Sequence, residues 1–420
     1  MIAAERRLID AAAVGAIADF GANSDSANDP ANAGQWGNER IVAAEAVRDL
    51  LTGSNPEWPI TAASGVSIAG AKITGQLDLA NAEVRRPIAF IKCSFEQPLR
   101  LNGAAIESLN LRGSWMPGLD ARFLRVRFDL QLCDGFRSGG VVRLSNAAIA
   151  GNLSFNGAIL NGDGQIALSA DDAVIEGHLL MGNGLVASGE ASLRRSHIGG
   201  MFYCSYGKFQ NPGGIAIAAE DCIVDGNVIM SNGFVAIGMA DLRRAHLRRL
   251  FYGAHGTFKN PANVAIALDD AVIGDRAFLG EWFAAKGAVR MPHAQIAGDL
   301  YCVGGIFQND GGDALYAEGI SVGGSVRMHA RFLAQGAVRL DHATIARTFN
   351  CSGGHFENAG GVALSADNAT IGRDVVLGSG FRASGAVRFA AATIGGEFDY
   401  EDAVCDPIVS DGAVVGDRPH

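Results

Sequence analysis

The sequence predicts a right-handed parallel β-helix, an all-β solenoid preceded by a small N-terminal α-helical cap. Apolar residues recur every 49 positions through most of the C-terminal part of the chain, and shorter apolar units recur every five or six positions before it. Glycine is abundant, at 56 residues, which suits short strands joined by tight turns. Internal repeats of this length are typical of solenoids, in which each repeat packs on its neighbours.

The composition limits the class of protein. Hydrophobic residues make up 48% of the 420 residues and charged residues 19%, which excludes a disordered chain. The net charge of −10 argues against a nucleic-acid backbone as a direct partner, because phosphate binding needs clustered Lys and Arg. We expect no membrane span, since no apolar run reaches the roughly 18–20 residues that a span needs. An N-terminus without a secretory signal and seven unclustered cysteines predict a cytoplasmic protein.

The N-terminal segment differs from the rest of the chain. Residues 4–20 have helical composition, residues 21–37 form a polar stretch, and Asn38 is expected to cap a second helix over residues 39–51. Gly53 and Pro56 should end that helix. We therefore predict that residues 1–62 are a helical cap and linker that closes the open end of the solenoid.

Residues 63–405 are predicted to form the solenoid and residues 406–420 a C-terminal tail. Up to about residue 138, apolar centres five or six residues apart fit a narrow four-sided coil of about 22 residues per turn. Beyond it, further apolar columns divide each 49-residue repeat into two turns of 24 and 25 residues, which places Leu168 one turn after Leu144 in the first repeat. The column that fixes the period contains Leu144, Leu193, Leu242, Met291, Leu340 and Phe389.

Residues 240–249 read Ala-Asp-Leu-Arg-Arg-Ala-His-Leu-Arg-Arg, and Ala191 to Arg195 are a near match to the same five-residue unit. This pattern resembles that of pentapeptide-repeat proteins, as a divergent relative, because sixes and sevens interrupt the fives. The chain also resembles a group of uncharacterised bacterial proteins sometimes labelled as oxidoreductases. The first resemblance implies a right-handed β-helix, and some members of that family mimic DNA and bind gyrase as acidic dimeric rods.

Two outward columns are the candidate partner-binding residues. The acidic column contains Asp171, Glu220, Asp269, Glu318 and Asp367, and its alternatives are turn capping by Asp, DNA mimicry or a carboxylate groove. The tyrosine column contains Tyr203, Tyr252 and Tyr301, spaced about 10 Å apart if they lie two turns apart. Aromatic rows bind sugars or protein partners, although ordinary strand propensity also explains them.

Other columns have structural interpretations. Cys204, Cys302 and Cys351 share an inward position and are predicted to be small packing residues. Gly378 to Ala383 match the G-x-G-x-x-A nucleotide motif, but Gly182 to Ala187 repeat it and no helix follows, so it is predicted to be a recurrent turn. One asparagine recurs in each repeat and is expected to be a left-handed loop residue; this column contains Asn211, Asn260, Asn309 and Asn358. An arginine column is expected to make the surface segregated by charge, and it contains Arg143, Arg290, Arg339 and Arg388.

The sequence favours a non-enzymatic solenoid that presents an elongated binding surface to a protein partner, as a scaffold or an inhibitor. No catalytic, cofactor-binding or metal-ligating residues are identified, and no cofactor is expected. One alternative is a DNA-mimicking topoisomerase-binding protein, which predicts a homodimer and a continuous acidic face. Another is a β-helix enzyme acting on a polysaccharide or with a redox cofactor, which predicts converging carboxylates or a bound coloured group.

Overall fold

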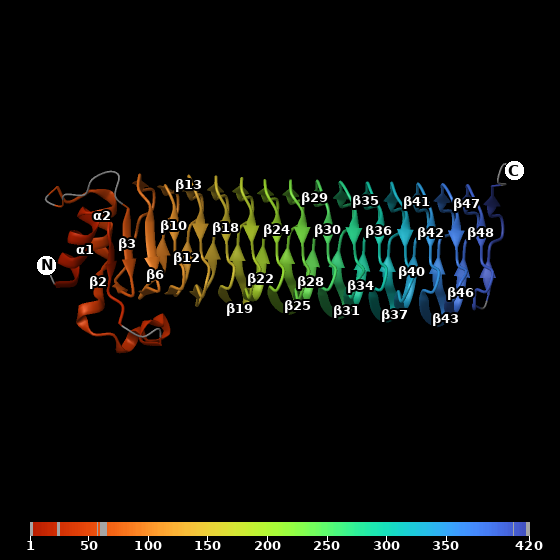
Figure 1. The fold of residues 1–420 in the computed structure, drawn as a ribbon, viewed down its shortest axis with the longest axis horizontal. Coiled ribbons are helices and arrows are strands. Elements are labelled where there is room, and N and C mark those ends of the chain that lie inside the picture. Colours follow the sequence, from red (N-terminus) through yellow and green to blue (C-terminus); the bar gives the residue numbers. More distant parts are fainter. Residues whose placement is uncertain (1–2, 23–25, 57, 59–64, 406, 417–420) are drawn as a thin grey trace. The chain divides into compact units, whose positions relative to one another are not determined.

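The computed structural model describes residues 3–22, 26–56, 58, 65–405 and 407–416, and it divides into two compact units. Unit 1 comprises Met1–Gly200 and Gly207–Gln210, and unit 2 comprises Met201–Tyr206 and Asn211–His420. Each unit is a parallel β-solenoid whose strands belong to three sheets, here named A, B and C (Figure 1). The described residues of the two units together make about 15 turns, which confirms the predicted fold class.

The N-terminal cap of unit 1 contains strands as well as the predicted helices. Helix α1 (Ala3–Ala13) ends before Gly15, which has a left-handed φ of 71°. Strand β1 (Ile17–Asp19) then pairs with β3 (Val66–Ala69), so the expectation of helix up to residue 20 is wrong. The polar stretch holds the short 3₁₀ helices η1 (Ser26–Asn28) and η2 (Pro30–Gln35).

The second helix begins later than the sequence predicts. A 3₁₀ turn, η3 (Asn38–Arg40), and strand β2 (Ile41–Ala43) precede helix α2 (Ala44–Thr52). Ala43, not Asn38, is the N-cap residue, because β-branched Ile41 and Val42 extend the chain into a pairing with β4 (Lys72–Thr74). Gly53 ends α2 in a left-handed conformation, as predicted.

Polar contacts hold the cap on the first turns of unit 1. The Arg40 guanidinium donates hydrogen bonds to the carbonyl oxygens of Gly70 (2.7 Å) and Ala27 (3.0 Å) and lies 3.7 Å from the Trp36 ring centroid. Asp29 pairs with Arg137 at 3.1 Å. Strands β1 and β2 pair with the first strands of sheets A and B, so the cap covers edges that would otherwise be unpaired. The predicted boundary at residues 62 and 63 lies outside the described residues.

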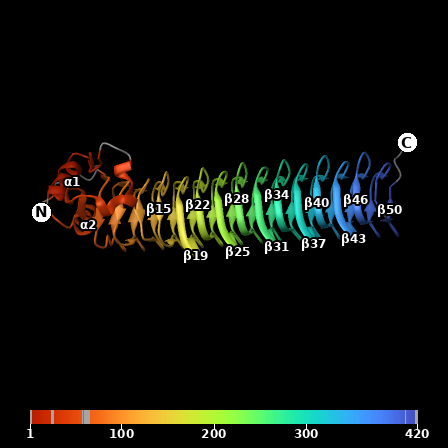
Figure 2. The same ribbon diagram turned by 90° about the horizontal axis from the view of Figure 1, so that it is seen from below.

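The early turns of unit 1 are four-sided. One turn contains β6 (Ile88–Ile91), β7 (Ser94–Phe95), β8 (Leu99–Arg100) and β9 (Ala105–Ile106), and β7 and β8 both belong to sheet B. Later turns replace these two short strands by one longer strand. In unit 2, 11-residue strands such as β37 (Ile306–Tyr316) alternate with seven-residue strands such as β40 (Leu333–Arg339) (Figure 2).

The 49-residue repeat is a double turn, but its two halves are less equal in length than the sequence predicts. In unit 1, Ile149 pairs with Ile175 and Ile175 pairs with Ile198, so a longer turn is followed by a shorter one. The same alternation holds in unit 2, where Phe202 pairs with Val228 and Val228 with Phe251. The longer half accommodates the excursion within each 11-residue strand, which the apolar columns do not reveal.

The core of unit 2 is a continuous stack of phenylalanines. Each half of the 49-residue repeat contributes one phenylalanine column, and the two columns alternate along one face of the core. The centroids of consecutive rings are 5.1–5.3 Å apart. Aromatic pairs at this distance each contribute about 0.5–1.5 kcal/mol beyond their burial. The stack contains Phe234, Phe258, Phe283, Phe307, Phe332, Phe356 and Phe381, all with 0% exposure.

Each long strand of unit 2 contains the predicted recurrent loop, but the asparagine of the loop has another structural role than the predicted one. The Asn309 side-chain amide donates to the carbonyl oxygen of Asp313 at 2.9 Å, and the left-handed residue is Gly311, with φ 74°. The expectation that Asn itself is left-handed is therefore wrong. Gly336 of the next turn packs against this loop, with φ 119°. A Cβ on Gly336 would lie 2.5 Å from the Asn309 carbonyl oxygen.

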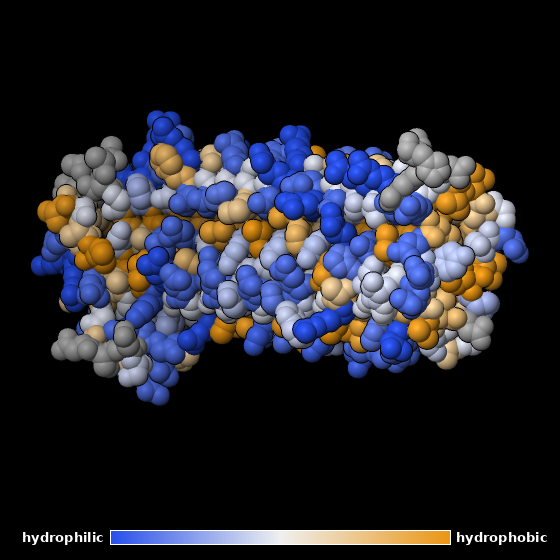
Figure 3. Space-filling model, turned by 45° about the vertical axis from the view of Figure 1, so that its right-hand side comes forward, coloured by the Kyte–Doolittle hydropathy of each residue, from blue (hydrophilic) through white to orange (hydrophobic). Residues whose placement is uncertain are grey.

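The solenoid of unit 2 continues into the segment predicted as a tail. Strand β49 (Ile408–Val409) pairs with β46 (Arg382–Arg388), and β50 (Val414–Val415) pairs with β47 (Thr393–Ile394). Apolar side chains gather at this C-terminal turn (Figure 3). Tyr400 and Val414 are 56% and 63% exposed, so this turn lacks the full burial of the turns before it.

Substituting Gly311 of the loop at Asn309 and Gly336 of the next turn separates backbone strain from steric overlap. Gly336→Ala should lower the free energy of unfolding by roughly 3 kcal/mol or more, because its Cβ overlaps a carbonyl oxygen. Gly311→Ala should cost about 1 kcal/mol, since nothing lies within 4 Å of its Cβ position and only the left-handed φ is unfavourable. Urea unfolding measures both, and equal losses would contradict the packing of this loop.

The Asp29–Arg137 pair should stabilise the cap in a pH-dependent manner. The backbone N–H of Ala31, followed by Arg137, lowers the pKa of Asp29 below its ordinary value of 3.8. A lowered folded-state pKa means that the stabilisation is present at neutral pH and is lost as the pH falls through that pKa. Asp29→Asn should therefore cost less than about 1 kcal/mol at pH 7, and progressively less as the pH falls through the lowered folded-state pKa of Asp29. A loss that persists in acid, measured by hydrogen exchange of the cap, would contradict this assignment.

Candidate functional site: the outward columns

An outward aromatic stripe follows sheet A of unit 2. It comprises Tyr203, Ile229, Tyr252, Phe278 and Tyr301. Each of these is the second residue of one of five successive paired strands, which are β24 (Phe202–Tyr203), β27 (Val228–Ile229), β30 (Phe251–Tyr252), β33 (Ala277–Phe278) and β36 (Leu300–Tyr301). All five are half-buried. The structure thus places the three predicted tyrosines two turns apart, as expected, and fills the gaps with Ile229 and Phe278, which the sequence reasoning missed.

The rings of this stripe fix one another in place. The ring centroids of Tyr252 and Phe278 are 5.4 Å apart and those of Phe278 and Tyr301 are 4.5 Å apart. Burial, followed by the nearby carboxylate of Glu281, raises the pKa of Tyr252. Side chains held in this way lose little conformational freedom when a partner covers them.

The acidic column is extensively paired with groups of the following turn. In unit 1, Asp171 accepts hydrogen bonds from the Ser192 hydroxyl and from the backbone N–H of Arg194 (3.0 Å). In unit 2, Asp367 accepts from the backbone N–H of Ala390 (2.8 Å) and pairs with Arg388 at 2.5 Å. The capping interpretation therefore holds for these two residues, although the capped backbone belongs to the next turn rather than to their own.

The remaining acidic residues also have cationic or hydroxyl partners. Asp269 pairs with Arg290 at 2.7 Å, and Glu220 pairs with Arg243 at 2.9 Å. The Tyr316 hydroxyl donates to Glu318 at 2.5 Å, and this hydrogen bond raises the pKa of Tyr316. Acidic and basic columns therefore lie side by side, so the predicted segregation of charge by face is wrong for this surface.

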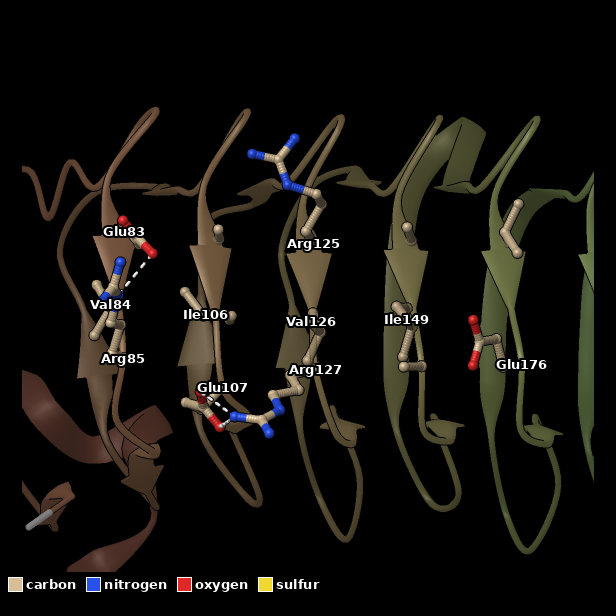
Figure 4. Close-up of a pocket in the computed structure, with 14 residues that line it drawn as sticks. Glu83, Val84, Arg85, Ile106, Glu107, Arg125, Val126, Arg127, Ile149 and Glu176 are labelled. Carbon is tan, nitrogen blue, oxygen red and sulfur yellow. Dashed lines mark hydrogen bonds and ion pairs between the residues drawn. The ribbon is translucent and has the colours of Figure 1, made fainter. Parts of the chain in front are cut away.

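A shallow groove of about 310 Å³ lies on the outer face of sheet C in unit 1 (Figure 4). Its charged lining is largely paired within itself. Arg127 contacts Glu107 at 3.1 Å, and Arg85 contacts Glu83 at 2.7 Å. Arg125 extends away from the strands in Figure 4. The described lining contains no Ser, Thr, Cys or His, and two of its three carboxylates, those of Glu83 and Glu107, are paired with arginine.

The remaining candidates are structural features of the repeat. Cys204, Cys302 and Cys351 are completely buried, as predicted for inward packing residues, and burial raises the pKa of each thiol. The G-x-G-x-x-A match is a tight turn with two left-handed residues, Ser379 and Gly380, which confirms the recurrent-turn interpretation. Among the described residues, no group of three His, Cys, Asp or Glu side chains is placed to hold a metal ion.

No helix in the described ranges has both the length and the apolar character needed to cross a membrane. Comparisons with family models, with curated proteins and with solved structures each found no match to this chain. In the five-residue units at 240–249, the side chains of Ala240, Leu242, Ala245 and Leu247 are all buried in the core. Membership of that family remains a prediction.

The buried thiols should be inert in the folded protein. A disulfide reagent at pH 8 should leave Cys204, Cys302 and Cys351 unmodified, because burial raises the pKa of their thiols and excludes the reagent. Cys405, which is half-buried, should react first. Mass spectrometric mapping before and after unfolding in urea measures this order. Rapid modification of Cys302 in the native state would instead support a redox-active column.

Proposed function

We propose that this chain is a non-enzymatic solenoid that presents an ordered surface to a protein partner, as a scaffold or an inhibitor. The observation that carries the proposal is the outward aromatic stripe of unit 2. Together with Ile229, its tyrosines and Phe278 lie in register on five consecutive strands. The rings of Tyr252, Phe278 and Tyr301 are packed against one another before any partner arrives. Tyr and Trp dominate the binding energy of protein interfaces because they offer large, rigid contact areas.

The acidic column is proposed as a polar surface that orients a partner rather than as the main source of affinity. Its carboxylates already have partners, such as Arg290 for Asp269 and Arg388 for Asp367. A half-exposed ion pair contributes about 1 kcal/mol or less, and it influences the rate and orientation of association more than the affinity. Asp171, Glu220 and Glu318 are assigned the same role.

We place this function in the cytoplasm, and a second copy of the chain is a further proposed partner. Six cysteines are buried free thiols, which suits a reducing compartment. The exposed apolar side chains of the C-terminal turn, including Tyr400, Val404 and Val414, favour self-association of unit 2. Sedimentation equilibrium tests the homodimer, and Val414→Lys should shift the protein toward monomer. A protein that is monomeric at all concentrations would contradict it.

Affinity purification from the native host, followed by mass spectrometry, tests the proposed function. The wild-type chain and a Tyr252→Ala/Tyr301→Ala variant serve as baits. A protein recovered by the first bait and lost from the second is then purified, and its affinity for both forms is measured. We expect the double substitution to cost at least about 2 kcal/mol, or roughly thirtyfold in Kd, because it removes two of the aromatic anchors of the stripe.

Phe123→Ala is the matched control, since Phe123 is a 57% exposed aromatic residue of unit 1. This variant should bind the partner like the wild type, and both variants should keep the wild-type circular dichroism spectrum. Recovery of the same proteins by all three baits would contradict the proposal. Enrichment of gyrase subunits with loss on Asp269→Asn and Asp367→Asn, but not on the tyrosine substitutions, would support the DNA-mimicking alternative instead.

A further inference from the structure

Trp282 occupies a backbone conformation that the equivalent turns give mostly to small residues. It is the second residue of a tight turn in which Glu281 and Trp282 both have positive φ, at 49° and 66°. The corresponding residues of two other turns in unit 2 are Gly233 and Gly380. A bulky residue is unfavourable in this left-handed region, whereas glycine is not. A tryptophan that is 64% exposed contributes little to the packing of the fold, so the cost of its unfavourable backbone conformation is not offset there.

This turn joins sheet A to sheet B, so Trp282 projects from a convex corner of unit 2. On one side of the corner lie Phe278 and Tyr301 of the aromatic stripe. On the other side, the outward positions of β34 (Ala284–Arg290), β37 and β40 are Ala284, Ile306 and Leu333. The tryptophan thus stands at the apex of an apolar ridge that covers both sides of the corner.

Exposed cations border this ridge, although the whole chain has a net charge of −10. Lys259 and Lys286 are paired residues of neighbouring strands on the sheet B side, and Arg331 occupies the corresponding corner position two turns beyond Trp282. None of the three has an ion-pair partner within the described part of the chain. The same turn carries one carboxylate, that of Glu281, whose proximity raises the pKa of Tyr252.

We propose that this corner of unit 2 docks on an anionic lipid surface, with Trp282 inserted at the level of the headgroups. Tryptophan prefers the interface between water and hydrocarbon, and neighbouring Lys and Arg side chains are attracted to anionic headgroups. A convex ridge suits a deformable layer, whereas a small ligand needs a concave site. One tryptophan and a few cations give weak, reversible and salt-dependent binding at the membrane surface.

Sedimentation with lipid vesicles tests the proposal on the full chain. The probes are vesicles of phosphatidylcholine alone and vesicles that also contain about 30 mol% phosphatidylglycerol. We expect a bound fraction at least about fivefold higher on the anionic vesicles, and Trp282→Gly should abolish most of this difference. Lys259→Glu/Lys286→Glu should reduce binding to the anionic vesicles and leave the background on the neutral vesicles unchanged.

Trp282→Gly is suited to this test because glycine occupies the same position in two equivalent turns, at Gly233 and Gly380, so the melting temperature should change by no more than about 3 °C. Phe123→Gly is the matched control. Phe123 is also exposed and left-handed, with φ 58°, but it belongs to unit 1, and its variant should bind like the wild type. Failure of the wild type to bind the anionic vesicles, or equal binding by Trp282→Gly, would overturn the proposal. Binding of an acidic protein in place of the vesicles would assign the ridge to a protein partner.

Discussion

The parallel hydrogen bonds between successive turns are the constraint on which the rest of each unit depends. In unit 2, the backbone N–H of Leu300 donates to the carbonyl oxygen of Ser325 at 3.0 Å, and that of Cys302 donates to the carbonyl oxygen of Arg327 at 2.8 Å. Such bonds fix which residues of neighbouring turns lie side by side. Each inward column must therefore contain residues of similar size and polarity, because these residues stack on one another. Extra residues are accommodated where they leave this register intact, as in the loop at Asn309.

This constraint explains why the fold was predictable from the sequence and the division of the repeat was not. Inward positions such as Leu242 and Leu340 recur because each must fill the same space, and both are almost completely buried. The lengths of the two half-repeats, in contrast, depend on the excursion within each long strand. The sequence placed Leu168 opposite Leu144, but the backbone pairs Leu168 with Val142, because a longer turn alternates with a shorter one.

The candidate site was predictable in the same partial way. The tyrosine column repeats with the 49-residue period, whereas Ile229 and Phe278 belong to the other half of the double turn and complete the stripe only when the halves are interleaved. A search with alternating steps of 26 and 23 residues, the lengths of the two half-repeats, would have found them. Trp282 lies where the repeat favours glycine, so it resembles an irregularity in the sequence and acquires meaning only from its exposure. At the cap, Asn38 is a good N-cap residue, but pairing of β2 with β4 outweighs that local preference.

Electrostatics distinguishes binding through the aromatic stripe from mimicry of DNA. A DNA mimic needs carboxylates that remain available to the cationic surface of its target. Asp269 and Asp367, in contrast, each form an ion pair with an arginine of the adjacent turn. The arginines recur with the same 49-residue period as the acidic residues. The repeat that places carboxylates in a column therefore also places the positive charges that neutralise them. Releasing these carboxylates for a partner would break ion pairs that are partly shielded from water, at a cost that offsets the new contacts. The aromatic stripe has no such cost, because its rings pack on one another and still leave part of their surface exposed.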